Sequence, residues 1–423
     1  MSTLAAPPLD VDKIRADFPI LDRQVNGHPM VYLDSAATSQ KPQVVLTAMA
    51  DYYAGHNGNV SRSVHTVGTE ATEAYEGARA KVAGFIGAAS PQEVVFTKNV
   101  TEAVNLVAYA FLAATTGGGD ERFRLRPGDS VVVTEMEHHS NLVPWQLLCE
   151  RTGATLRWFG ITDDGRLDLS RLDEIVDERT KLVSFTHVSN VLGTINPTAP
   201  VVARAREVGA LVMLDSAQAV PKLPVNVADL GVDFMGFTGH KMCGPTGIGV
   251  LWGRAELLDV MPPFLGGGSM IETVTMEGST FAALPAKFEA GTPPIAEAIG
   301  LAAAIDYLND IGMANIHAYE QALTAYALEA LASVPDLRIF GPASAADRGG
   351  LVSFDLAGVH PHDVGQVLDS QGVEVRVGHH CARPACRRFG VAATTRASFY
   401  LYNTEAEVDA LVRGLAHVRK VFG

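Results

Sequence analysis

The stretch VDFMGFTGHKMCGPTGIG, residues 232–249, decides the fold that this sequence predicts. The apolar run Val232–Phe237 predicts a buried strand, and Thr238–Lys241 follows where that strand ends. A glycine-rich turn leads into a second apolar run, Ile248–Trp252. In open α/β sheets, ligands bind beyond the carboxyl ends of the strands. We therefore expect an α/β fold in which Lys241 lies at a ligand site.

Lys241 suits covalent chemistry with a carbonyl group. Burial at the end of a strand lowers the pKa of a lysine amine, and the free amine can then form a Schiff base. The alternative is a lysine that extends into solvent, as most lysines do. The tetrapeptide Thr238–Lys241 leaves both interpretations open, and the rest of the chain decides between them.

The composition is typical of a large globular enzyme. A length of 423 residues predicts two domains. Hydrophobic residues make up 47% and charged residues 19% of the chain, which excludes a disordered protein. The formal net charge of −14 argues against nucleic-acid binding. We find no apolar run of bilayer length and no signal-peptide pattern, so we expect a soluble, cytoplasmic protein without a membrane segment.

Continuous apolar runs predict further strands of the same sheet. Such runs are typical of a parallel sheet whose two faces are both covered by helices. The predicted strands are Glu93–Thr97, Ser130–Thr134, Leu182–Thr186 and Leu211–Leu214. Polar side chains follow these strands: Thr101, His138, Asn190, Asp215 and Gln218. One site at the carboxyl edge of the sheet can collect all of them.

Thr101 stands at a turn from a strand into a helix. Backbone N–H groups and the helix dipole favour an anion at such a turn, so Thr101 is a candidate for a phosphate site. The alternative is an ordinary N-cap, in which Thr101 closes the first turn of the helix. Both interpretations stay open from this segment alone.

Three regions are predicted along the chain. Residues 1–30 form an arm that packs with the small domain, residues 31–295 form the large domain, and residues 296–423 form a smaller α+β domain. The small domain has three strand-like runs: Leu351–Leu356, Val373–Val377 and Ala397–Tyr402. Its closing helix is predicted at Glu405–Phe422, with Thr404 and Glu407 as a capping box.

Pyridoxal phosphate matches this set of residues, because it forms a Schiff base with lysine and carries a phosphate and a basic ring nitrogen. Asp215 can pair with the ring nitrogen and keep it protonated. His138 can lie over the ring and transfer protons. The other candidates are hydrogen-bonding side chains: Asn190 and Gln218 for the phenolic oxygen, and Thr101, Thr238 and His240 for the phosphate. A structural role explains each residue alone, but not the whole set in this order.

Five segments carry a resemblance to a known family. They are SNVLGT (189–194), LDSAQAV (214–220), TGHKMCGPTGIG (238–249), RVGHHCARP (376–384) and RASFYLYNT (396–404). The chain resembles the fold-type I, class V pyridoxal-phosphate enzymes, and most of all the SufS-type cysteine desulfurases. The resemblance extends from Phe18 to Phe422. It implies a fold-type I transferase fold, with a large cofactor-binding domain and a small domain that carries a catalytic cysteine.

The resemblance also implies how the cofactor is held. Lys241 binds it covalently, Asp215 pairs with its ring nitrogen and His138 stacks on its ring. The remaining contacts come from hydrogen-bonding side chains: Gln218, Asn190, Thr101, Thr238 and His240. In this family the other subunit of a homodimer completes the phosphate site. The matching segment is 288–293, which makes Thr292 the expected donor.

Cys381 occupies the position of the persulfide-forming cysteine in this family. Arg396 matches the arginine that clamps the substrate carboxylate, and Arg376 and Asn190 are expected beside it as substrate-binding residues. The cationic residues near Cys381 favour the thiolate, which is the nucleophile.

A metal site is the rival interpretation of this segment, with ligands at His379, His380, Cys381 and Cys386. Adjacent residues of an extended segment point to opposite faces and rarely bind one ion, so no metal is expected. The other cysteines are interpreted as small buried hydrophobic residues: Cys149, Cys243 and Cys386.

The resemblance implies that the enzyme converts L-cysteine to L-alanine and leaves a persulfide on Cys381. It also implies a role in iron–sulfur cluster assembly by the SUF system and its scaffold complex. Cys381 precedes Arg396 by only 15 positions. This short loop cannot carry sulfur far, so a SufE- or SufU-like carrier protein is expected. His362 is a candidate contact for such a carrier, and the alternative, that His360 and His362 are two solvated loop histidines, stays open.

Three alternatives to this function stay open. They are a selenocysteine lyase, a class V aminotransferase, and a catalytically idle scaffold of a cluster-assembly complex. The aminotransferase leaves Cys381 without a role, and a scaffold has no chemical need for Lys241, Asp215 or Arg396.

Overall fold

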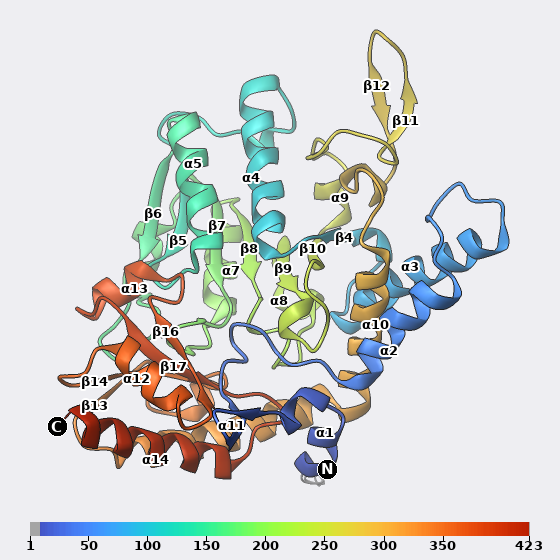
Figure 1. The fold of residues 1–423 in the computed structure, drawn as a ribbon. Helices are drawn as coiled ribbons and strands as arrows, with labels where there is room; N and C mark the ends of the chain where they lie inside the picture. Colours follow the sequence, from blue (N-terminus) through green and yellow to red (C-terminus); the bar gives the residue numbers. More distant parts are fainter. Residues whose placement is uncertain (1–8, 423) are drawn as a thin grey trace, which may run out of the picture.

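A seven-stranded mixed sheet forms the centre of the molecule (Figure 1), in a computed structural model that describes residues 9–422. The strand order is β4-β10-β9-β8-β7-β5-β6. In chain order the strands are β4 (Val94–Thr97), β5 (Ser130–Thr134), β6 (Thr155–Phe159), β7 (Thr180–Thr186), β8 (Leu211–Asp215), β9 (Phe234–Thr238) and β10 (Gly249–Gly253). Only β10 runs antiparallel to its neighbours, so the predicted, mostly parallel α/β sheet is confirmed.

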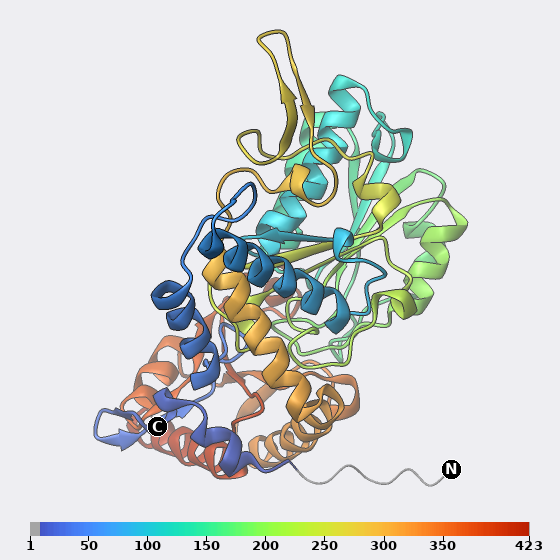
Figure 2. The same cartoon turned by 90° about the vertical axis from the view of Figure 1, so that its right-hand side faces the viewer.

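Both faces of this sheet are buried, because neighbouring residues of each strand pack on opposite sides. Val131 and Val133 belong to one apolar cluster, and Val132 between them belongs to the other. Helices α4 (Val100–Gly117) and α5 (Val143–Thr152) cover the first face. Helices α3 (Thr66–Phe85), α7 (Thr198–Glu207) and α10 (Ile295–Ile311) pack on the second (Figure 2). The continuous apolar runs in the sequence have this physical cause.

The remaining helices are shorter or lie outside the central sheet. They are α1 (Val11–Ala16), α2 (Gln43–Gly55), α6 (Leu172–Ile175), α8 (Val227–Leu230), α9 (Ala255–Leu258), α11 (Met313–Ala332), α12 (Pro361–Asp369), α13 (Arg383–Arg388) and α14 (Glu405–Phe422). Helix α10 packs along α2 and α3, and the chain then continues into α11. A hairpin of β11 (Ile271–Val274) and β12 (Ser279–Phe281) projects from the molecule (Figures 1 and 2).

A second, antiparallel sheet lies in the C-terminal part, in the order β13-β14-β17-β16. Its strands are β13 (Leu337–Phe340), β14 (Leu351–Leu356), β16 (Arg376–Gly378) and β17 (Thr394–Ser398). Helices α11, α12 and α14 bury their apolar faces with it in a separate cluster. The N–H of Thr404 donates to the Glu407 carboxylate, and the N–H of Glu407 donates to the Thr404 hydroxyl. The predicted capping box of α14 is therefore confirmed.

The N-terminal arm is tied to this C-terminal part. Strands β1 (Gln24–Val25) and β2 (His28–Pro29) form a small hairpin, and β3 (Val31–Tyr32) pairs in parallel with β15 (Val373–Glu374). The guanidinium of Arg15 bonds the carboxylate of Glu407 at 3.0 Å. The domain boundaries predicted from the sequence stay a prediction.

Two strand predictions are wrong in this part. Residues 373–377 are not one strand, because the chain changes sheets at Val375 between β15 and β16. Residues 399–402 are not a strand either: β17 ends at Ser398, and the aromatic run that follows is a buried turn. Tyr400 donates its hydroxyl to the carbonyl of Pro221. An apolar run thus indicates that a segment is buried, but not that it is a strand. A turn can be buried as well, provided that its backbone polar groups are hydrogen-bonded.

Within residues 9–422 no helix is long and apolar enough to cross a membrane.

Candidate active site

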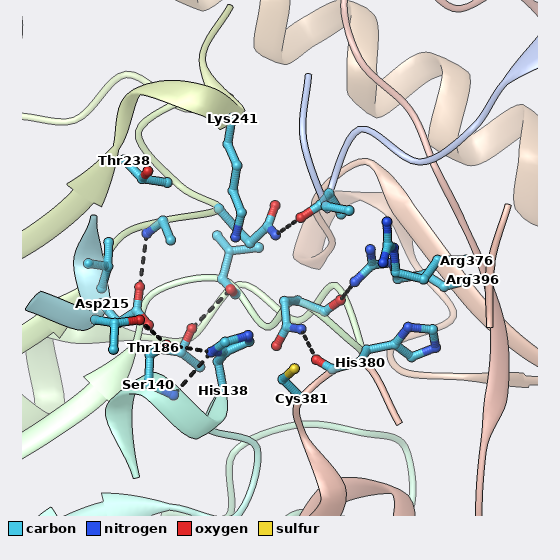
Figure 3. Close-up of a pocket in the computed structure, with 18 of the residues that line it drawn as sticks. His138, Ser140, Thr186, Asp215, Thr238, Lys241, Arg376, His380, Cys381 and Arg396 are labelled. Atoms are coloured by element: carbon cyan, nitrogen blue, oxygen red, sulfur yellow. Dashed lines mark hydrogen bonds between the residues drawn. The ribbon is translucent and has the colours of Figure 1, made fainter. Parts of the chain in front are cut away.

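A cavity of about 470 Å³ opens at the carboxyl ends of the central strands (Figure 3). Eleven residues predicted for the site line it: Thr101, His138, Asn190, Asp215, Gln218, Thr238, His240, Lys241, Arg376, Cys381 and Arg396. They come from both the central sheet and the C-terminal part, which meet here. Thr292 is the one predicted site residue that does not line this cavity.

Lys241 reaches into the cavity from the short 3-10 turn Gly239–Lys241, directly after β9. Figure 3 shows its side chain extending toward the centre of the cavity, with Asp215 and Thr238 on one flank and the arginines on the other. Burial lowers the pKa of Lys241 to about 8, although the charge of Asp215 opposes this shift. The amine is therefore far more available as a nucleophile than an exposed lysine amine, and the solvent-exposed alternative is wrong.

Four buried polar atoms of residues that line the cavity have no hydrogen-bond partner among the described residues. They are Gln218 Oε1, Thr238 Oγ1, His380 Nδ1 and Arg396 Nε. Asp215 accepts one backbone N–H, from Ala217 at 3.0 Å, and burial raises its pKa. Buried polar groups are ordinarily satisfied, so this cluster fits a polar, charged ligand that brings its own partners. A group with a protonated ring nitrogen, a phenolic oxygen and a phosphate, such as pyridoxal phosphate, fits these residues.

Thr101 is at the second position of α4 and does not cap the helix. Asn99 is the N-cap, since its side chain accepts the N–H of Glu102 at 3.0 Å. The Thr101 hydroxyl instead lies 2.6 Å from the hydroxyl of Ser140, at the wall of the cavity. The N-cap interpretation of Thr101 is therefore wrong, and the start of α4 presents its N–H groups and a hydroxyl to the site.

His138 is held by the turn that follows β5. The N–H of Ser140 donates to His138 Nδ1 at 3.1 Å, so the proton of the neutral ring is on Nε2. Burial lowers the pKa of His138 to about 3, and the nearby charge of Lys241 acts in the same direction. His138 is thus a neutral, flat side chain at neutral pH, suited to lie against an aromatic ring. Sequence reasoning missed Ser140, whose only signal is its position two residues after His138.

Glu137 is a second residue that sequence reasoning missed. It is completely buried and accepts hydrogen bonds from Thr134 Oγ1 at 2.5 Å, Asn141 Nδ2 at 2.7 Å and Thr186 N–H at 3.0 Å. Burial raises its pKa to about 8. These bonds join the ends of β5 and β7 and fix the backbone immediately before His138.

Asp34 bridges the two arginines of the site, and it too was missed. Its carboxylate bonds Arg376 through both oxygens, the shortest contact being 2.7 Å, and bonds Arg396 Nη2 at 3.2 Å. Arg396 Nη1 also donates to the carbonyl of Asn190 at 2.8 Å. Arg396 is buried and held on two sides, while its Nε is left without a protein partner.

Cys381 is exposed, whereas the other three cysteines of the chain are buried. Its backbone and that of His380 both have left-handed φ values, of +54° and +50°. This conformation costs about 1–2 kcal/mol for each non-glycine residue, so other contacts must hold it.

Three hydrogen bonds hold the Cys381 turn. Asn190 Nδ2 donates to the His380 carbonyl at 2.7 Å, the His139 N–H donates to the Cys381 carbonyl at 2.7 Å, and the Cys381 N–H donates to His379 Nδ1 at 3.1 Å. The backbone that carries the exposed thiol is therefore held at the mouth of the cavity that contains Lys241.

We expect His380 to make the stability of the folded protein depend on pH. It is buried, its Nε2 lies 2.9 Å from Thr394 Oγ1, and burial lowers its pKa to about 3. In the unfolded chain this histidine has a pKa of about 6.5 and becomes protonated below that pH, whereas in the folded chain it stays neutral. The folded state therefore loses stability relative to the unfolded state as the pH falls below about 6.5. As the pH falls from 6.5 to 5, we expect the unfolding free energy of wild type to drop by about 2 kcal/mol more than that of His380→Asn, which lacks this titrating group. Urea unfolding of both apoproteins at each pH measures it, and a difference that is constant across pH contradicts the assignment.

Thr292 is exposed and lies in a separate pocket with Lys98 and Glu102. Glu289, three residues earlier, anchors this segment, because its carboxylate bonds Arg79 at 2.6 Å and the N–H of Phe96 at 2.8 Å. The segment is therefore anchored at Glu289, and Thr292 is exposed to solvent and does not line the cavity of its own chain.

Among residues 9–422 there is no group of three or more His, Cys, Asp or Glu side chains arranged to hold a metal ion.

Known proteins match the whole chain. The family described as "Aminotransferase class-V" matches residues 31–411. A protein of Streptomyces coelicolor named "Probable cysteine desulfurase" is 64% identical over 416 residues, covering 98% of each chain. A "Cysteine desulfurase" of Haloferax volcanii is 53% identical over 428 residues, with 98% of each covered. The solved apo structure of a cysteine desulfurase from Thermococcus onnurineus has a TM-score of 0.89 at 39% identity, covering 100% of this chain and 99% of that one. The chain belongs to the class-V aminotransferase family, and its fold is that of the fold-type I enzymes.

Proposed function

We propose that this protein is a pyridoxal-phosphate-dependent cysteine desulfurase, which converts L-cysteine to L-alanine and leaves a persulfide on Cys381. The observation that carries the proposal is the placement of one exposed thiol at the mouth of the cavity into which Lys241 reaches. The names of the full-length relatives support the same activity.

The residues at the cavity provide a partner for each polar part of the cofactor. Lys241 would bind it covalently, and Asp215 would pair with its ring nitrogen. His138, neutral at neutral pH, would lie on the ring. Hydrogen bonds would come from side chains that lack a partner or face the cavity: Asn190 and Gln218 to the phenolic oxygen, and Thr101, Thr238 and His240 to the phosphate.

Arg396 is placed to bind the substrate carboxylate. Its guanidinium is buried, oriented by Asp34 and Asn190, and has a free Nε at the cavity. Holding the carboxylate there fixes the orientation of the substrate Cα–H bond, which is a large part of the catalytic benefit. Arg376 is more exposed and adds positive charge on the same side.

When bound, pyridoxal phosphate supplies an electrophilic group for the substrate amine and accepts electrons from the substrate Cα. Lys241 Nζ, with its lowered pKa, takes the proton from Cα and later returns one to the product. The Cys381 thiolate attacks the sulfur of the substrate. A new S–S bond forms as the substrate C–S bond breaks, and the electron pair of that bond stays with the carbon, which is protonated to give alanine. L-cysteine and one enzyme thiol thus give L-alanine and one enzyme persulfide.

The test is turnover of L-cysteine by the purified protein with a reductant, with alanine and sulfide both quantified. Release of alanine and sulfide in equal amounts supports the proposal that the protein is a cysteine desulfurase. A protein that binds the cofactor but releases neither product favours the aminotransferase or the idle scaffold. The same assay with L-selenocysteine distinguishes a selenocysteine lyase.

We further propose a homodimer in which Thr292 of one subunit completes the phosphate site of the other. Its position away from the cavity of its own chain supports this arrangement. We expect Thr292→Val to raise the cofactor concentration for half-maximal activity about 10-fold, because a hydrogen bond to a charged group is lost.

Mixed dimers test whether this contribution comes from the partner subunit. We would co-purify differently tagged Thr292→Val and Lys241→Ala chains. The only site with a lysine then has an intact partner threonine, so the cofactor requirement is expected to return to the wild-type value. A requirement that stays 10-fold higher contradicts the arrangement.

Sulfur delivery to iron–sulfur cluster assembly by the SUF system in the cytoplasm, through a SufE- or SufU-like carrier, is part of the same proposal. The held Cys381 turn supports it, since a fixed thiol needs an acceptor that comes to it. His362 is proposed as one carrier contact. It is exposed, and its ring stacks with that of His360 at a centroid distance of 6.1 Å.

A further inference from the structure

A groove of about 980 Å³ runs between α5, strand β6 and α13, separate from the cofactor cavity. Strand β6 is the edge of the central sheet, so no other strand of residues 9–422 pairs with it on the side of the groove. Trp158 on β6 is 58% exposed and Val143 at the start of α5 is 42% exposed. An exposed tryptophan beside other apolar side chains is typical of the centre of a protein interface.

The groove begins next to Cys381. His139 lines it, and the same residue donates its backbone N–H to the Cys381 carbonyl at 2.7 Å. The N–H of Arg383 donates to His139 Nε2 at 3.3 Å, and Arg383, two residues after Cys381, also lines the groove. A chain that lies in the groove therefore comes, at one end, beside the turn that carries the exposed Cys381 thiol.

The charge along the groove differs from that of the protein as a whole. Arg383 and Arg387 are exposed on α13, and neither guanidinium bonds a carboxylate of the described residues. Arg388, by contrast, pairs with Asp163 at 2.7 Å. Among the described residues that line the groove, Glu135 is the one that is acidic. The whole chain has a net charge of −14, so most of its surface repels an acidic partner. The basic groove attracts such a partner and so favours binding at this place.

We propose that this groove binds an acidic segment with apolar side chains from a thiol-bearing acceptor protein, which takes the sulfur from Cys381. The apolar side chains contact Trp158 and Val143, and the carboxylates contact Arg383 and Arg387. The acceptor thiolate attacks the outer sulfur of the Cys381 persulfide. The S–S bond breaks, Cys381 leaves as its thiolate and the acceptor gains the persulfide, with no net oxidation or reduction. This inference rests on the proposed function.

Two synthetic peptides test the groove. Each has one cysteine and one leucine, and one carries aspartates and glutamates where the other carries lysines. The holoenzyme is loaded with L-cysteine, freed of excess substrate and mixed with each peptide, and transfer of sulfur is followed by mass spectrometry. We expect the acidic peptide to react about 10-fold faster, and Arg383→Glu/Arg387→Glu or Trp158→Ala to remove this advantage. Discharge by dithiothreitol is expected to be unchanged in these variants.

Arg413→Glu is the matched control, because Arg413 is an exposed arginine on α14, outside the groove. Equal rates for the two peptides, or the same loss in Arg413→Glu, overturn the proposal. A serine version of the acidic peptide, labelled for fluorescence anisotropy, separates the two hypotheses. If Cys381 forms no persulfide yet this peptide binds wild type and not Arg383→Glu/Arg387→Glu, the groove stands while the desulfurase proposal fails. If it binds neither protein, the groove proposal fails.

Discussion

Cys381→Ser is expected to lower the release of alanine and sulfide from L-cysteine by about 10³-fold or more, while cofactor binding stays as in wild type. Cys381 is the only exposed cysteine, and no other thiol of the chain reaches the cavity. A serine hydroxyl keeps the size of the side chain but is not ionised at neutral pH, so it does not attack sulfur. Quantification of both products, with the cofactor absorbance recorded beside them, measures this effect.

Cys386→Ala is the control for the Cys381 substitution. Cys386 is only five positions away, but it is buried and its thiol faces the carbonyl of His379 at 3.8 Å. Its removal is expected to affect stability more than turnover, so activity is compared at equal folded protein. Alanine formation that survives in Cys381→Ser shows that another group cleaves the C–S bond.

Lys241→Ala is expected to lower turnover by about 10⁴-fold or more and to abolish covalent attachment of the cofactor. Lys222 is buried near the site and Lys241 is half-buried in it, and the two lysines differ in their partners. Lys222 donates to Glu320 and to the Phe399 carbonyl, so it is held in an ion pair. Lys241 has no such contact with a carboxylate of residues 9–422, and burial lowers its pKa to about 8. Of these two lysines, Lys241 is the one that is free to react, and it lines the cavity.

Borohydride reduction followed by mass spectrometry measures the attachment. In wild type the cofactor is expected on the peptide that contains Lys241, and in Lys241→Ala on no peptide. Lys420→Ala, which changes an exposed lysine on α14, is expected to behave as wild type. Cofactor found on another lysine of the wild-type protein would contradict the assignment of Lys241 as the lysine that binds the cofactor.

The sequence predicted the central sheet well, because its strands are buried on both faces. Ser130–Thr134 was predicted to the residue, and Lys241 was placed correctly at the end of a strand. Polar residues at strand ends also converge for a simple reason, since parallel strands end at one edge. For these residues the local pattern was sufficient.

The missed residues act through contacts that no local pattern shows. Asp34 bonds Arg376 and Arg396, which are 342 and 362 positions away in the chain. Glu137 stands beside His138, but its partner in β7 is 49 positions further on. Tyr400 was assigned to a strand because burial and strand structure have the same apolar signal. Thr292 acts, in our proposal, on another subunit, and a single sequence predicts such contacts only through family resemblance.

The most direct test of the desulfurase proposal is the mass of the peptide that contains Cys381 after one round of reaction with L-cysteine in the absence of reductant. The proposal predicts one added sulfur atom on this peptide and one alanine released per loaded subunit. Alanine released with the added sulfur on a different cysteine, or on none, would contradict the role of Cys381 as the acceptor of the substrate sulfur.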